Sequence, residues 1–415
     1  MRRALLVLTI LLGSAVFPAF AQPSGSTTAD LVLVGGTIYI NPTEAPITNG
    51  VIVIQGGKIA AVGTRAQVQT PQNTPTLDCS GRTITAGFWN SHVHFFERKW
   101  ANAALPAPEL TRQLQDMLTR FGYTSAFDLG SSWENTRRIR DRIESGEATG
   151  PRIRSTGDAL APKNPGVPAD VVLNLLGVMK PALFEIANAS EGAAAARTFL
   201  NAGVDGIKLF ASSPPTSPLP DGAIAAAVDE AHKSKKPVFA HPNTSADVLA
   251  AIRGGVDVIA HTTPRSGAWD ETILAAIKER RPALIPTVTI WKYFARHDRI
   301  SAQDQVTNVE LGQLRAWIAA GGTVLFGNDL GAVDYDPTQE YILMAQSGMS
   351  FRQILASMTI APAERFGEST NLGRIAAGFQ ADLVVLKDDP SKNIRALTDV
   401  QYTLRAGKII FRAGE

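Results

Sequence analysis

TAGFWNSHVH, residues 85–94, is an apolar strand-like run that ends in a pair of histidines. Side chains alternate between the two faces of an extended strand, so His92 and His94 point to one face and Val93 to the other. Histidines with this spacing can give two nitrogen ligands to one metal ion, and imidazole suits zinc, iron, nickel and copper. The pair alone is equally consistent with a solvated strand end.

The positions of the other histidines favour a metal site over a solvated strand end. The chain has six histidines, of which only His232 and His297 lie away from the ends of strand-like runs, and both are expected at the surface. A lysine and an aspartate belong to similar runs, at 206–210 and 323–329. Six potential ligands are therefore found at the ends of five predicted strands: His92, His94, Lys208, His241, His261 and Asp329.

Composition limits the class of protein. The chain has 415 residues, 45% of them hydrophobic, and a net charge of +2, which indicates a globular protein with an ample core in one large domain or two. Basic and acidic residues are interspersed and nearly balanced, so no nucleic-acid partner is expected. Cys79 is the only cysteine, which rules out an internal disulfide, so stability must come from the core.

Residues 1–21 are predicted to be a secretory signal peptide. Two arginines precede an apolar run, and Ala19-Phe20-Ala21 has the small-x-small pattern of a cleavage site. The alternative is a membrane anchor, but the run is short for a spanning helix and is interrupted by Gly13 and Pro18. No cysteine precedes the cut, which argues against a lipoprotein. We therefore expect a periplasmic or secreted protein with no membrane attachment once the signal is removed.

Between residues 86 and 366, strand-like runs alternate with helix-like segments. The runs lie at 87–93, 124–130, 152–157, 205–211, 237–242, 257–263, 283–290 and 323–329, and helix-like segments include 109–121, 190–202, 221–234 and 308–320. Eight β-α repeats over about 280 residues match a TIM (β/α)8 barrel, and continuous apolar runs fit strands buried on both faces. A doubly wound open sheet is the alternative. The barrel is favoured because only a closed sheet lets ligands from the first and last strands converge.

The two flanks of this region have a different pattern. Residues 22–85 hold short β-branched runs separated by glycine-rich pairs such as Gly35-Gly36, which is typical of antiparallel strands with tight turns. Residues 367–415 repeat this pattern of strand, turn and strand. Both ends of the chain are therefore predicted to form one small β-sandwich domain, with residues 86–366 inserted between its halves as the metal-dependent barrel.

Residues 86–94 resemble the strand-1 signature of the amidohydrolase superfamily, proline-glycine-phenylalanine-isoleucine-aspartate-x-histidine-x-histidine. Ala86 replaces the proline and Asn90 replaces the aspartate, a carboxylate that could otherwise bond to a ligand histidine. Residues 359–386 resemble the family's return into its β domain, so the similarity covers nearly all of the chain after the predicted signal. The chain is most similar to the imidazolonepropionase-like and prolidase-like branch, whose binuclear members carry a lysine where Lys208 lies.

The resemblance implies a binuclear centre of two divalent metal ions, with zinc as the expected metal. A buried ammonium is costly, whereas a neutral lysine can add carbon dioxide and form a bridging carbamate; the alternative for the lysine is a surface position. Two ions about 3.5 to 4 Å apart would turn a shared water into a nucleophilic hydroxide, with Asp329 as the catalytic proton carrier. By the family's pattern, one ion is held by His92, His94 and Asp329, the carbamate of Lys208 bridges, and the outer ion is held by His241 and His261.

The substrate contacts are less well defined by sequence. Residues 161–188 form a long apolar segment, which is either a helix packed on the barrel or a lid over an apolar substrate group. This segment has no histidine or tyrosine to polarise a carbonyl, so Tyr293 or the metal itself is the candidate for that role. Basic residues beyond the strands could bind a substrate carboxylate, although each could equally be a solvated surface charge: Lys163, Arg265, Lys292 and Arg296.

These observations predict a secreted, metal-dependent hydrolase that cleaves the amide C–N bond of an N-acyl amino acid or dipeptide with an apolar group. Hydrolysis of an ester, lactone or phosphotriester on the same centre is the first alternative. A non-catalytic binding module is the second, although every ligand position is filled here. The expected partners are a small-molecule amide and further copies of the chain in a homo-oligomer, with no nucleic acid and no membrane.

Overall fold

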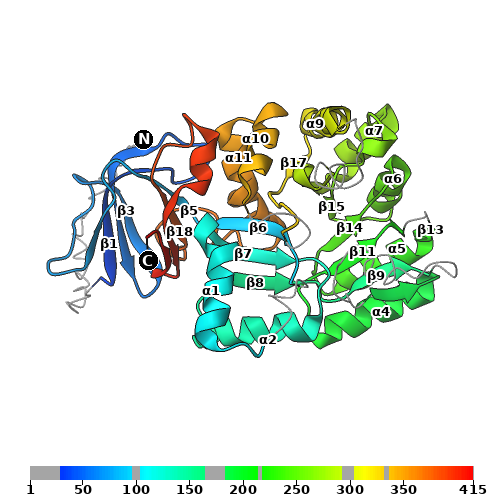
Figure 1. Ribbon diagram of the computed structural model, residues 1–415, viewed down its shortest axis with the longest axis horizontal. Helices are drawn as coiled ribbons and strands as arrows, with labels where there is room; N and C mark the ends of the chain where they lie inside the picture. The colour runs from blue at the N-terminus through cyan, green and yellow to red at the C-terminus, as the bar shows by residue number, and fades with distance from the viewer. Residues whose placement is uncertain are drawn as a thin grey trace, which may run out of the picture.

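The computed structural model describes residues 29–95, 103–163, 183–213, 217–291, 303–330 and 336–414. The predicted signal peptide, His297, most of the apolar segment 161–188 and the candidate substrate contacts Lys292, Tyr293 and Arg296 lie outside these ranges. Figure 1 shows a β-sheet at one end of the molecule, made from the blue and red parts of the chain, and a larger region of parallel strands and helices beside it.

Strands from both ends of the chain share one eight-stranded sheet in the order β20-β19-β18-β5-β1-β2-β3, with β4 paired to β1. The strands are β1 (Leu31–Ile38), β2 (Ile47–Gln55), β3 (Lys58–Thr64), β4 (Thr76–Asp78), β5 (Thr83–Ala86), β18 (Leu383–Leu386), β19 (Val400–Arg405) and β20 (Lys408–Arg412). The antiparallel pair β5 and β18 joins the two halves. Leu33, Ile84 and Leu383, all fully buried, belong to one core cluster that both halves build.

Two local predictions for this sheet are wrong. The predicted antiparallel pattern fails where β1 pairs parallel with both β4 and β5. Gly35 and Gly36 were expected to form a turn, but they lie inside β1. Gly35 has a φ of +85°, and the register between β1 and β2 shifts next to it, so the glycines form a β-bulge within one strand.

The larger region has a TIM-barrel-like α/β fold in which two sheets contain only parallel pairs. The first sheet is β6 (Phe88–Val93), β7 (Tyr123–Asp128) and β8 (Arg152–Ser155). The second follows the order β10 (Leu183–Ile186), β9 (Ala159–Pro162), β11 (Ile207–Phe210), β14 (Val238–His241), β15 (Val258–Ala260), β16 (Ala283–Ile285) and β17 (Thr323–Val324). A separate two-stranded pair consists of β12 (Ser212–Ser213) and β13 (Ser217–Pro218).

Hydrogen bonds link the first parallel sheet to the second at both of its edges. At the β6 edge, the amide of Ser91 donates to the carbonyl of Phe326 at 2.8 Å and that of His94 donates to Leu330 at 2.7 Å. At the β8 edge, the amide of Asp205, just before β11, donates to the carbonyl of Ser155 at 2.7 Å. The segment after β17 therefore runs beside the strand that carries the histidine pair.

Two of the predicted barrel strands end early. The run 283–290 was predicted to be one strand, but β16 stops at Ile285 and residues 288–291 are helical. Pro286 has no amide hydrogen for a sheet, and Thr287 has a φ of +43°, so the chain turns there. The run 323–329 is a strand only over its first two residues. Gly327 passes so close to β6 that an added Cβ would lie 2.7 Å from the Cβ of His92.

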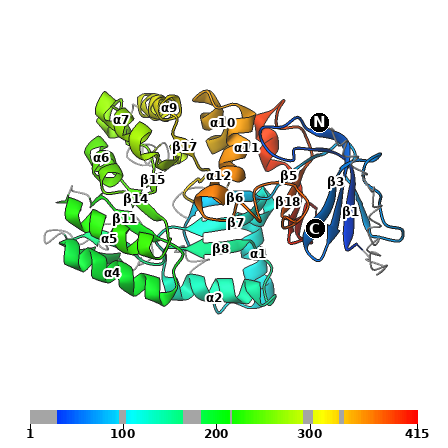
Figure 2. The same cartoon turned by 180° about the vertical axis from the view of Figure 1, so that it is seen from behind.

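Helices lie outside the parallel strands (Figures 1 and 2). They are α1 (Ala107–Met117), α2 (Trp133–Glu144), α4 (Ala189–Ala202), α5 (Asp221–Lys233), α6 (Ser245–Arg253), α7 (Glu271–Arg280), α9 (Gln303–Ala319), α10 (Thr338–Gln346), α11 (Phe351–Met358) and α12 (Ile360–Arg365), with 3-10 turns at Thr119–Phe121, Pro264–Ser266 and Ile394–Thr398. Every residue of β6 and β7 is buried, as expected of strands covered on both faces. Among the described residues, no helix combines the length and apolar character needed to cross a bilayer.

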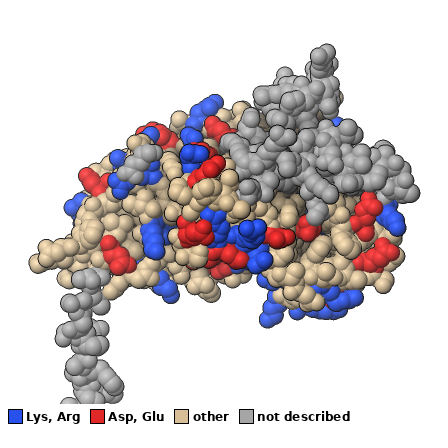
Figure 3. Space-filling view, turned by 60° about the horizontal axis from the view of Figure 1, so that its bottom comes forward, with Lys and Arg blue, Asp and Glu red and all other residues tan. Residues whose placement is uncertain are grey.

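Charged side chains of both signs are intermixed on the face drawn in Figure 3. Some ion pairs join the N-terminal end of a parallel strand to the C-terminal part of the chain. Arg152 at the start of β8 donates to Asp382 at 2.9 Å, and Arg154 in the same strand contacts Glu368. Asp382 is only 5% exposed, and the first of these pairs joins the residue before β18 to the barrel-like region.

Candidate metal centre

Five of the six predicted ligands lie at or just beyond the carboxyl ends of parallel strands, and Lys208 lies inside β11, two residues before its end. In TIM-barrel enzymes this end of the strands carries the active site. His241 is partly exposed, and the other five side chains are buried. They come from β6 (His92 and the following His94), β11 (Lys208), β14 (His241), the residue after β15 (His261) and the segment after β17 (Asp329).

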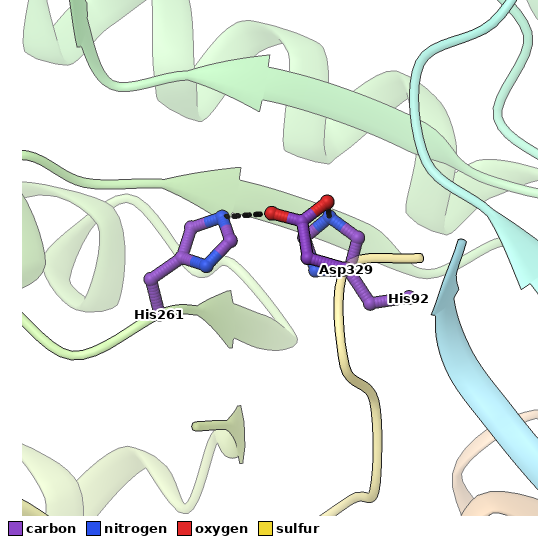
Figure 4. Close-up of side chains that lie close together, drawn as sticks. All are labelled: His92, His261 and Asp329. Atoms are coloured by element: carbon purple, nitrogen blue, oxygen red, sulfur yellow. Dashed lines mark ion pairs between the residues drawn. The ribbon is translucent and has the colours of Figure 1, made fainter. Parts of the chain in front are cut away.

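The Asp329 carboxylate lies close to three of the histidines. Figure 4 shows the Asp329 carboxylate close to the rings of His92 and His261, and the Nε2 to oxygen distances are 3.4 and 3.8 Å. The Nε2 atom of His94 lies 2.9 Å from Oδ1 of Asp329 and 3.2 Å from Nε2 of His92. One ligand atom from each of His92, His261 and Asp329 fits within 4.8 Å of the others, so this buried group could hold a metal ion.

His241 and Lys208 lie beside this group. The rings of His241 and His261 are 4.5 Å apart between centroids and nearly perpendicular. Lys208 is 1% exposed, and its Nζ has no hydrogen-bond partner among the described residues. Burial is the main cause that lowers the pKa of His92, His241 and His261, and the charge of Lys208 lowers it further. An unpartnered buried amine beside converging imidazoles and a carboxylate is a donor set that suits divalent cations.

The protonation states of these groups also suit metal binding. Burial lowers the pKa of His92 and His261 well below the usual value, and it lowers the pKa of His241 to about 4. These imidazoles are therefore neutral at pH 7 and keep a lone pair for a cation. Burial also lowers the pKa of Lys208 to about 8, against the opposing effect of the Asp329 carboxylate. A lysine with that pKa is partly neutral near pH 7, as carbamate formation requires.

The Lys208 pKa gives a test on the metal-free protein. Its native pKa is about 8, whereas the unfolded chain holds the proton until about 10.5, so the unfolded state binds more protons between these values. The free energy of unfolding should therefore rise with pH across this window, by about 3 kcal/mol in total. Lys208→Met keeps the side-chain length without the amine, so it should remove this rise and be the more stable form below pH 8. Urea unfolding of the wild type and of Lys208→Met between pH 8 and 10.5 would measure the two free energies of unfolding. An equal rise with pH in the variant would contradict the assignment of the lowered pKa to Lys208.

Backbone conformation contributes to the site in a way that sequence patterns did not indicate. His261, Thr287 and Asp329 have φ values of +80°, +43° and +55°, a region that non-glycine residues avoid. Each costs on the order of 1–3 kcal/mol and persists only where surrounding contacts hold it. One such contact joins Nδ1 of His261 to Oγ1 of Thr287 at 2.5 Å, which leaves Nε2 of the ring facing Asp329.

Asn90 has a role that the sequence comparison did not predict. Its Oδ1 accepts the backbone amide hydrogen of His92 at 3.2 Å, and its Nδ2 donates to Oδ1 of Asn328 at 2.7 Å. The asparagine therefore ties β6 to the residue just before Asp329. An amide at position 90 can make both bonds, since it accepts through Oδ1 and donates through Nδ2.

The other candidate residues lie away from this cluster or at its edge. His232 is exposed on α5, as predicted, and its Nε2 lies 2.8 Å from a carboxylate oxygen of Asp257. Lys163 is exposed just after β9, and the guanidinium of Arg265 lies 5.8 Å from the ring centre of Trp291. Sequence analysis missed Thr287, Asn328 and Asn243, whose side chains bond to the ligand histidines or to Asn90. Single polar residues in loops carry no periodic signal that would have identified them.

A TIM-barrel-like fold with a buried histidine and aspartate cluster at the carboxyl ends of its strands defines a class of metal-dependent hydrolases. The chain belongs to the amidohydrolase family, whose profile matches residues 83–410. It is accordingly a hydrolase acting on C–N bonds, and the predicted membership of the amidohydrolase family is confirmed.

Two relatives illustrate this similarity. Ochratoxinase from Aspergillus niger is 23% identical over 430 residues, which cover 92% of this chain and 87% of that protein. Its crystal structure superposes with a TM-score of 0.76, covering 92% of this chain and 96% of the other. The crystal structure of a Xaa-Pro dipeptidase with bound methionine in the active site has a TM-score of 0.77 at 21% identity, covering 92% of this chain and 100% of the other. At these identities the superpositions show a shared fold.

Proposed function

We propose that this chain hydrolyses the amide bond of N-acyl amino acids or dipeptides that carry an apolar group. The observation that carries the proposal is the buried cluster of His92, His261 and Asp329 beside an unpartnered Lys208. The Xaa-Pro dipeptidase shares the fold over its full length, which supports a dipeptide-like substrate. The proposal includes closure of the two parallel sheets into a (β/α)8 barrel, with the flanking strands as a β-sandwich.

We propose the same metal ligands that the family resemblance implies. When bound, two divalent ions, with zinc as the expected metal, would activate a water molecule and polarise the substrate carbonyl. Lys208, which is buried, would be a ligand as its carbamate, and by the family's pattern it would be shared between the ions. By the same pattern His92, His94 and Asp329 would hold the inner ion and His241 with His261 the outer ion; in the structure a ligand atom of His261 also lies within 4.8 Å of those of His92 and Asp329.

Asp329 carries the proton in this proposal. Histidines bound to metal through one nitrogen cannot also accept a proton there, which leaves the aspartate as the base of the cluster. Its carboxylate is 3% exposed and faces three histidine rings, so a proton that it takes up is protected from bulk water. Asp329 would accept the proton of the attacking water and deliver it to the leaving nitrogen, which turns a poor leaving group into a neutral amine.

Substrate would approach over His241. Among the six ligands this residue alone is partly exposed, while the others are at most 8% exposed. Phe210 is also partly exposed, and its ring lies 5.1 Å from that of His241. Because side chains two residues apart on a strand share a face, Phe210 lies on the same side of β11 as Lys208, nearer to the carboxyl end. An aromatic ring at this point favours an apolar substrate group beside the outer ion.

A substrate panel tests this proposal. Purified, zinc-loaded protein should prefer N-acyl amino acids and dipeptides with benzyl or isobutyl groups over methyl analogues by at least ~10-fold in kcat/KM, since each buried methylene contributes up to ~0.8 kcal/mol. Esters, lactones and phosphotriesters belong in the same panel. A preference for small polar amides, or faster cleavage of a matched phosphotriester than of any amide, would contradict the proposal.

Export is also proposed, on the signal-like pattern of residues 1–21. A periplasmic or secreted hydrolase with a buried lone thiol at Cys79 has no disulfide to form, so the fold would not depend on the redox state of its surroundings.

A further inference from the structure

His241 contacts a polar network in the loop after β14. The Nε2 atom of its ring lies 3.2 Å from Oδ1 of Asn243. The side-chain Nδ2 of Asn243 donates to the carbonyl oxygen of Ser212 at 2.9 Å and lies 3.2 Å from Oγ of the same serine. The side-chain nitrogen of Asn243 is therefore directed at Ser212, and its oxygen faces the imidazole.

Asp247 fixes the other side of this network. Its Oδ2 accepts from Oγ of Ser212 at 2.6 Å and from the backbone amides of Asn243 and Thr244 at 3.0 and 2.8 Å. Asp247 is 6% exposed and belongs to the capping box that begins α6, with Thr244 as the N-cap residue. The Asn243 side chain is thus held between β12 and the first turn of α6, and it has little freedom to rotate away from His241.

An acceptor in this position selects one form of the histidine. A neutral imidazole carries its single hydrogen on either Nδ1 or Nε2, and the hydrogen bond of one nitrogen decides which. Because the Asn243 oxygen can only accept, Nε2 must carry the hydrogen, and Nδ1 keeps the lone pair. His261 is arranged in the opposite way, since its Nδ1 is bonded to Thr287 and its Nε2 faces Asp329.

We propose that Asn243 is a positioning residue that holds His241 as the Nε2–H tautomer with Nδ1 as its metal-binding atom. This inference rests on the proposed function for the assignment of His241 to the outer ion. Partners of this kind orient a ligand ring, and their loss typically lowers metal affinity by ~10- to 100-fold.

Cobalt titration of the metal-free full chain tests the metal side of the inference. Asn243→Ala should bind the first Co2+ as wild type does and the second ~10- to 100-fold more weakly, read from the visible absorption of the ion. Asn243→Asp keeps an acceptor beside Nε2 and should retain more of the second site than the alanine variant. The matched control is Thr244→Ala, which removes the neighbouring helix cap. It should lower the melting temperature and leave both Co2+ affinities unchanged.

The tautomer can be read without metal. In the metal-free wild type labelled with 15N-histidine, the His241 signals, identified by their loss in His241→Gln, should show the hydrogen on Nε2; Asn243→Ala should give a mixture. Hydrogen on Nδ1 of wild type, or equal second-site affinity in Asn243→Ala, overturns the inference. Loss of the second ion in Thr244→Ala would also overturn it, because weaker metal binding could then result from any disturbance of this loop and not from loss of the Asn243 contact. A wild type that binds one Co2+ but shows the Nε2–H form contradicts the binuclear function and supports the positioning role.

Discussion

Asp329→Asn should lower kcat by ~10² to 10⁴-fold while the chain still binds metal. The amide keeps an oxygen that can approach the His92 and His94 rings, which lie 3.4 and 2.9 Å from the carboxylate. It cannot take up a proton from the attacking water, so the transfer to the leaving nitrogen is lost. Steady-state kinetics on the preferred amide, with metal content measured on the same sample, would separate loss of turnover from loss of metal.

Asp257→Asn is the matched control for this substitution. Asp257 precedes β15 at the end of the strand opposite to His261, and it bonds to His232 and to the amide of Val238. Its change should reduce stability without a comparable effect on kcat. Near-normal turnover in metal-loaded Asp329→Asn would remove the aspartate from the mechanism.

Lys208→Ala should abolish binding of the outer ion and lower activity by more than ~10²-fold. The expected loss exceeds that for a residue that only orients a ligand, because the bridging group itself is removed. The small cavity left by the side chain could admit a short carboxylate, so formate or acetate with bicarbonate should restore part of both metal and activity. Lys163→Ala, an exposed lysine just after β9, is the control and should keep its full metal content.

An alanine variant at position 208 that keeps two ions and full turnover would contradict the bridging role. The size of the added carboxylate gives a second test of the bridging role. Propionate and longer acids should restore less metal binding and activity to Lys208→Ala than formate does, if the cavity admits only a small anion.

The residues of the candidate site could be proposed from sequence because each belongs to an apolar run or directly follows one. A polar residue that closes an apolar run is visible in local sequence, and parallel strands bring such ends to one edge. In this way His92, His241 and Asp329 could be selected although they are far apart in the chain. The TIM-barrel-like fold followed from the same alternation of apolar runs and helix-like segments.

The contacts that hold the ligands were not predictable in this way. Asn90 and Asn328 are 238 residues apart, and no local pattern relates two single asparagines. The bond from His261 to Thr287 depends on a positive φ that follows Pro286, which a strand pattern over 283–290 does not reveal. Register and bulges likewise depend on tertiary packing, as the parallel pairing of β1 with β5 shows.

The metal content of the purified chain tests the central claim most directly. Protein should be expressed with zinc and bicarbonate and then freed of loosely bound ions. Inductively coupled plasma mass spectrometry should then find two equivalents of zinc per chain, because the proposed ligands would form two sites. A content far below one equivalent, in a chain that is folded and cannot be reloaded with zinc or cobalt, would contradict a metal-dependent hydrolase and favour a non-catalytic binding module.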